Sequence, residues 1–97
     1  MTGKAVSDVE AAVVERVQTG VRMEKRLLKT LKALADYHDL TLGDLLEGIV
    51  LHAFEGKTPF GDESLDRIAE LRKVFGLTLG ASDAHRLREE PRRRRKR

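Results

Sequence analysis

Hydrophobic and polar residues alternate one by one between residues 17 and 24. A period of two is typical of a β-strand with one buried face. The chain has no second segment of this kind, so the backbone hydrogen bonds of this strand need a partner outside the chain. We therefore expect it to pair with the same strand of a second copy. One side of the strand carries Val17, Thr19, Val21 and Met23, and the other carries Gln18, Gly20, Arg22 and Glu24.

The spacing of apolar residues changes to three and four after this segment and predicts two helices. The first covers residues 25–37, with leucines on one side and basic residues on the other. Thr41 is a good N-cap for the second helix, residues 42–55, which we expect to end at Gly56. The second helix has so broad an apolar face that it needs more than one neighbour. That face comprises Leu42, Leu45, Leu46, Ile49, Val50, Ala53 and Phe54.

The flanking segments predict further, shorter elements. A capping-box pattern at residues 7–10 predicts a short helix to Glu15, with a loose arm as the alternative. Asp62 predicts the start of a third helix, residues 63–75, and residues 82–88 a last short helix before Pro91. The sequence Leu-Thr-Leu-Gly occurs twice, at residues 40–43 and 77–80. Chance or shared capping chemistry explains this better than an internal duplication.

These patterns divide the chain into an N-terminal arm or helix (1–16), a compact unit (17–56), a helical extension (57–90) and a basic tail (91–97). With 97 residues and 4% aromatics the chain has little interior for a catalytic pocket, so we expect a binding module, no enzyme and no cofactor. The absence of cysteine excludes disulfides, thiolate zinc sites and a cysteine nucleophile. No apolar run is long enough to span a membrane and no signal peptide is evident, which predicts a cytoplasmic protein.

Charge is distributed very unevenly along the chain. The formal net charge of +3 includes +6 from the six basic residues 92–97. Residues 16–32 carry a net +5, whereas residues 33–91 carry −6 and residues 1–15 carry −2. A run of six basic residues binds nucleic acid by releasing counterions. The sequence thus contains two basic zones, separated by an acidic body, and the basic tail favours nucleic acid as a partner.

The order of strand, basic helix and capped helix over residues 17–55 resembles the ribbon–helix–helix family of DNA-binding proteins, of the Arc and MetJ repressor type. The resemblance implies an all-α fold with one short strand, forming a ribbon–helix–helix homodimer to which this chain adds one or two C-terminal helices. In that family two strands pair into an antiparallel ribbon that enters the major groove of double-stranded DNA. The function implied is sequence-specific DNA binding as a dimer, in a nucleoid-associated transcriptional repressor.

The same resemblance implies roles for individual residues. Base contacts would come from Gln18, Gly20 and Arg22, since glutamine suits adenine and arginine suits guanine. Phosphate contacts would come from basic side chains and from the start of the second helix, whose free amides suit an anion. These are Lys25, Arg26, Lys29, Thr41, Leu42, Gly43, Arg92, Arg93, Arg94, Arg95, Lys96 and Arg97. The dimer core would contain Val17, Val21, Met23, Leu31, Leu45 and Ile49.

Two other functions stay open, that of an antitoxin and that of an adaptor. An antitoxin-type or adaptor dimer would bind another protein through the amphipathic residues 63–88. A metal site would have to use His38, His52 and His85, which share no ligand spacing, so we expect no metal. For catalysis, Asp36, His38 and Asp39 form the only compact acid–base group, and no nucleophile is placed beside them in the sequence. The serines Ser7, Ser64 and Ser82 all fall at expected helix starts, where capping explains them.

Overall fold

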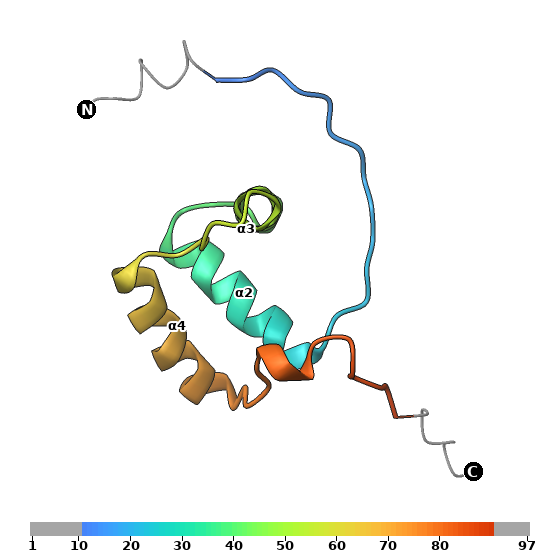
Figure 1. The fold of residues 1–97 in the computed structure, drawn as a ribbon, viewed down its shortest axis with the longest axis vertical. Coiled ribbons are helices and arrows are strands. Elements are labelled where there is room, and N and C mark those ends of the chain that lie inside the picture. Colours follow the sequence, from blue (N-terminus) through green and yellow to red (C-terminus); the bar gives the residue numbers. More distant parts are fainter. Residues whose placement is uncertain (1–10, 91–97) are drawn as a thin grey trace.

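The computed structural model describes residues 11–90, and every regular element within them is helical. The three α-helices are α2 (Lys25–Tyr37), α3 (Leu42–Phe54) and α4 (Asp62–Phe75), followed by a short 3₁₀ helix, η1 (Ala81–Asp83). Helix α2 contacts both α3 and α4, and α4 runs back alongside α2 (Figure 1). Helix α2 is therefore the central element of the fold, and α3 rests on it from one side only.

The ends of the helices follow from capping interactions. Helix α2 has the predicted bounds, and the Glu24 carboxylate accepts a hydrogen bond from the Leu27 backbone N–H at 2.8 Å. Helix α3 is capped as predicted, because Thr41 Oγ1 accepts a hydrogen bond from the Asp44 N–H at 3.0 Å. Helix α4 begins one residue earlier than expected, and Asp62 is its first residue rather than its cap. The Gly61 that precedes it offers no side chain to cap with.

A small apolar core lies where the three α-helices meet. Leu34 and Ala35 of α2 and Leu45 of α3 are buried, at 1%, 3% and 5% exposure. Leu77, after α4, is the fourth buried hydrophobic residue among those described. Five partly buried side chains pack around the three-residue centre: Leu31, Ile49, Phe60, Ile68 and Leu71. Since burial of apolar surface is the main stabilising term, so small a core leaves a single chain with modest stability.

The predicted strand is absent, and the ribbon–helix–helix fold class is wrong for the chain as described. Residues 11–24, here called the arm, form no regular structure and run outside the helical body (Figure 1). All of them are exposed except the half-buried Met23 and Glu24. A strand requires a neighbouring strand to take its N–H and C=O groups, and no other segment of residues 11–90 lies against the arm in this way. The described chain is all-α without a ribbon.

Two of the expected short helices also differ. The helix predicted over residues 82–88 is only the three-residue η1, followed by irregular backbone. Its sole large apolar residue, Leu87, is 51% exposed and is not among the residues packed against the core, so little packing stabilises a longer helix. The N-terminal helix predicted to Glu15 does not form over residues 11–15, and the rest of it lies outside the described residues.

Candidate nucleic-acid interface

The exposed side of α2 carries four cations. Lys25, Arg26, Lys29 and Lys32 are all exposed, and within residues 11–90 none of them forms an ion pair. They are here called the basic face of α2. Lys25, Lys29 and Lys32 recur at intervals of four and three, so they share one side of the helix. Because the opposite side is packed into the core through Leu34 and Ala35, these cations point to solvent.

The positions of these charges on α2 do not stabilise the helix. The N-terminal end of a helix carries a partial positive charge, so basic residues in the first turn are unfavourable and acidic ones favourable. Helix α2 has Lys25 and Arg26 in its first turn, no acidic residue there and no basic residue in its last turn. Only the capping carboxylate of Glu24 offsets this, and the hydrogen bond that it accepts from the Leu27 N–H lowers the pKa of Glu24. An external anion would stabilise this arrangement.

The start of α3 meets one requirement of a phosphate site. Thr41 Oγ1 accepts a hydrogen bond from the Asp44 N–H. The N–H groups of Leu42 and Gly43, in contrast, have no acceptor among the described residues. Gly43 is exposed, and a Cβ there would meet only Thr41 Oγ1, at 3.9 Å. Free N–H groups at a helix start attract anions. The Asp44 and Glu47 carboxylates on the same turns repel them, so the charge of this end of α3 depends on what neutralises those two groups.

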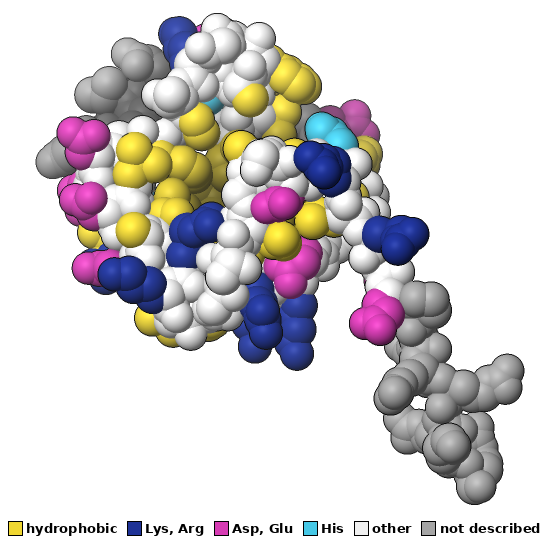
Figure 2. All heavy atoms as spheres, turned by 60° about the horizontal axis from the view of Figure 1, so that its bottom comes forward, with side chains coloured by type: hydrophobic (Ala, Val, Ile, Leu, Met, Phe, Trp, Pro, Cys, Tyr) yellow, Lys and Arg dark blue, Asp and Glu magenta, His cyan; other side chains and the backbone are white. Residues whose placement is uncertain are grey.

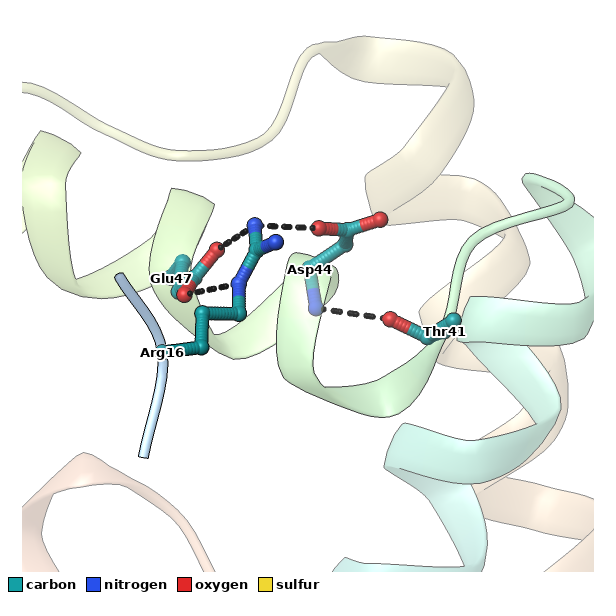
Figure 3. A network of polar contacts seen from close by, with 4 residues as sticks. All are labelled: Arg16, Thr41, Asp44 and Glu47. Carbon is teal, nitrogen blue, oxygen red and sulfur yellow. Dashed lines mark hydrogen bonds and ion pairs between the residues drawn. The ribbon is translucent and has the colours of Figure 1, made fainter. Parts of the chain in front are cut away.

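Arg16 of the arm is the side chain that neutralises them (Figure 3). Its guanidinium donates to both carboxylate oxygens of Glu47, at 2.9 and 2.8 Å, and to Asp44 at 3.2 Å. The hydrogen bonds from Arg16 lower the pKa of Glu47, and those to Glu47 raise the pKa of Arg16. Sequence reasoning missed this role. The spacing of Asp44 and Glu47 puts two carboxylates on one face of a helix, but nothing local indicates which cation reaches them.

The predicted base-contacting residues all lie on the arm. Gln18, Gly20 and Arg22 are exposed, and Gln18 has no side-chain hydrogen bond among the described residues. Arg22 does have a partner: its guanidinium forms an ion pair with Glu89 in the C-terminal segment, residues 84–90. That hydrogen bond raises the pKa of Arg22. The predicted phosphate contacts at residues 92–97 lie outside the described residues.

The six residues predicted for a dimer core separate into two groups. Leu31, Leu45 and Ile49 pack within one chain, around Leu34 and Ala35. Val17 and Val21 remain exposed on the arm, at 78% and 74%, and Met23 is half-buried. The structure thus assigns half of the set to the core of a single chain.

Helix α3 leaves its other side uncovered. Val50, Leu51 and Phe54, here called the α3 face, are 43%, 63% and 81% exposed. Glu47 lies one turn before Leu51 on the same side, so its contact with Arg16 brings the arm to one end of the α3 face. The space-filling view in Figure 2 shows that hydrophobic side chains also reach the surface of the molecule and line a hollow in it. Exposure of this extent on one helix is typical of a surface that another molecule covers.

A polar cluster joins the end of α2 to the start of α4. The Tyr37 hydroxyl donates to Glu63 at 2.6 Å, and the guanidinium of Arg67 lies 4.3 Å from the centre of the Tyr37 ring. His38 Nε2 and Ser64 Oγ are 3.0 Å apart, so a serine does lie beside the acid–base group, which sequence order did not reveal. The cluster is exposed and ties two helices together. In residues 11–90 no three potential ligand side chains gather in a way that could hold a metal ion.

The segment proposed to bind another protein is largely used inside the chain. Residues 63–88 contain most of α4, and its Ile68 and Leu71 pack against the core. Leu65 and Val74 remain exposed, at 50% and 71%. Part of the apolar side that would take up a partner therefore packs against the core of the same chain instead.

No family model, curated protein or solved structure matches this chain. Among the helices of the described residues, none combines the length and the apolar character needed to cross a bilayer. The functional interpretation therefore rests on the side chains themselves.

Proposed function

We propose that this protein binds double-stranded DNA as a dimer and acts in the cytoplasm, at the nucleoid, as a transcriptional repressor. The observation that carries the proposal is the basic face of α2, with four exposed cations and no ion pair within the described residues. Exposed cations on one rigid helix are the electrostatic footprint of a surface that contacts phosphates. Helix α2 contains one acidic residue, Asp36 in its last turn. The other acidic residues among those described lie outside α2, and two of them are neutralised by Arg16.

The arm supplies the side chains suited to reading bases. It follows directly before α2, so contacts of the basic face with the DNA backbone bring Gln18 and Arg22 close to the grooves. Glutamine pairs with adenine and arginine with guanine, each through two hydrogen bonds. The basic residues 92–97 add affinity that does not depend on the DNA sequence.

The α3 face supports the dimeric state, with a second copy of this chain as the occupant. Helix α3 carries large apolar side chains both on the side packed into the core and on its exposed side, so burying all of them takes a neighbour besides α2. Covering Leu51 and Phe54 contributes about 1.5–3 kcal/mol for each side chain. Arg16 ties the arm to Glu47 at one end of this face, and the arm adds exposed valines of its own, Val17 among them. A second copy presents a matching surface of both parts.

The test is DNA binding by the full chain, measured by fluorescence anisotropy at several salt concentrations. The double variant Lys25→Gln/Lys29→Gln removes two charges from the basic face. We expect weaker binding and a slope of log K against log salt that is smaller by about 0.9 for each DNA phosphate that the variant no longer neutralises. The matched control is Lys57→Gln/Lys73→Gln, which removes two exposed lysines from a loop and from α4.

Only the first variant should change the salt slope. Equal decreases in affinity for both double variants would show that net charge alone governs binding and that the basic face of α2 is not an interface. Circular dichroism of each variant checks that the helices remain intact.

A further inference from the structure

A carboxylate of the C-terminal segment contacts Arg22, one of the arm residues that we propose to contact DNA. Glu89 forms an ion pair with Arg22, across 67 positions of the sequence. Both side chains are largely exposed, at 70% and 83%. An ion pair so open to water is easily broken, because exposed ion pairs add little net stability.

The same guanidinium atoms are needed for two partners. Arg22 donates to Glu89 through its terminal nitrogen, and these terminal N–H groups are the ones with which arginine recognises guanine or a phosphate. A guanidinium can donate to two acceptors at once, as Arg16 does, but the Glu89 carboxylate takes a terminal N–H of Arg22, and its negative charge repels a guanine or phosphate acceptor beside it. Binding of DNA through Arg22 is therefore weakened while Glu89 is in place and strengthened when Glu89 is displaced.

We propose that Glu89 acts as an intramolecular competitor that occupies Arg22 until DNA displaces it. This inference rests on the proposed function, because it specifies how DNA binding is restrained. Neighbouring Glu90 forms no ion pair within the described residues, so the contact is specific to one of two adjacent carboxylates. The contact is salt-sensitive, because both charges are screened by the solution around them.

The chain offers a matched pair of variants for testing this competition. Glu89→Gln and Glu90→Gln remove the same charge from adjacent positions, and only the first breaks the ion pair. We expect Glu89→Gln to tighten DNA binding at low salt by about two- to five-fold more than Glu90→Gln does, with the difference fading at high salt. In the Arg22→Ala background the two variants should behave alike, because Glu89 then has no guanidinium at position 22 to pair with.

A second measurement tests the contact without DNA. The chain has no cysteine, so Leu87→Cys provides a single site for a spin label close to Glu89. We expect the label to broaden the backbone amide signal of Arg22 in the NMR spectrum. The broadening should decrease with Glu89→Gln and persist with Glu90→Gln.

Each outcome separates the two proposals. Equal tightening by both glutamine variants, tightening that survives Arg22→Ala, or broadening that is insensitive to Glu89→Gln would overturn the competition while leaving DNA binding intact. A wild-type chain that binds no DNA at any salt concentration would overturn the proposed function and the competition with it. In that case the NMR result would still establish whether the two segments meet.

Discussion

Single side chains cap the starts of α2 and α3, Glu24 in the first case and Thr41 in the second. Thr41 and Thr78 stand in the same local sequence, Leu-Thr-Leu-Gly, yet only Thr41 caps an α-helix. Its Oγ1 accepts the Asp44 N–H, whereas Gly80 precedes η1 and the Asp83 carboxylate accepts the Gly80 N–H at 2.8 Å. The first copy could be interpreted from the sequence because an apolar stripe follows it. The second copy lacks such a stripe.

Thr41→Ala should therefore destabilise the protein, and Thr78→Ala should not. Loss of an N-cap hydrogen bond costs about 1 kcal/mol, which corresponds to a decrease in Tm of about 4–8 °C for a domain of this size. Thr78 is exposed and caps no helix, so its replacement is expected to have a much smaller effect. Thermal unfolding followed by far-ultraviolet circular dichroism measures both. Equal decreases in Tm would contradict the capping role of Thr41.

Whole elements were predictable wherever a stripe of apolar residues coincided with an end signal. Helix α2 has the expected bounds, α3 ends one residue earlier than predicted, and α4 begins one residue earlier. The stripes of these helices meet in one core through Leu34, Leu45 and Ile68, so packing reinforced local preference. Residues 17–24 have the period of a strand but no partner within the described chain. Periodicity reports which side chains could share a face, and it does not supply the neighbouring backbone.

The end of α4 offers a test at the scale of the element. Gly76 has φ 69°, in the left-handed region that glycine enters without strain, and it closes α4. Gly76→Ala should cost about 1–2 kcal/mol, because an L side chain in that conformation approaches the following carbonyl oxygen. The control is Gly80→Ala, where the backbone is extended and a Cβ would meet nothing within 4 Å. Urea unfolding compares the two midpoints, and a destabilisation at Gly80 as large as that at Gly76 would refute the conformational explanation.

At the scale of the whole molecule, the exposed hydrophobic side chains are more informative about function than the buried ones. The described residues bury four hydrophobic side chains and expose twelve large ones. Sequence patterns indicated that α3 needs more than one neighbour, and within residues 11–90 it contacts only α2 among the helices. The sequence did not predict the pairing of Arg16 with Glu47 or of Arg22 with Glu89. Which charges a long, exposed side chain can reach depends on the path of the backbone, and these partners are far apart in the sequence. Those two contacts tie the arm to α3 and to the C-terminal segment.

Self-association through the α3 face is the prediction that concerns the molecule as a whole. Phe54 is 81% exposed in a single chain, so Phe54→Glu would change the stability of a monomer by no more than about 0.5 kcal/mol. If a second copy covers this face, the buried and unpaired carboxylate should dissociate the dimer. Val74→Glu is the control, since Val74 is similarly exposed, at 71%, but lies on α4. Sedimentation over a range of protein concentrations should give dimers for the wild type and for Val74→Glu, and monomers for Phe54→Glu. A monomeric wild type, or dimers that tolerate Phe54→Glu, would mean that the α3 face is not where two copies meet.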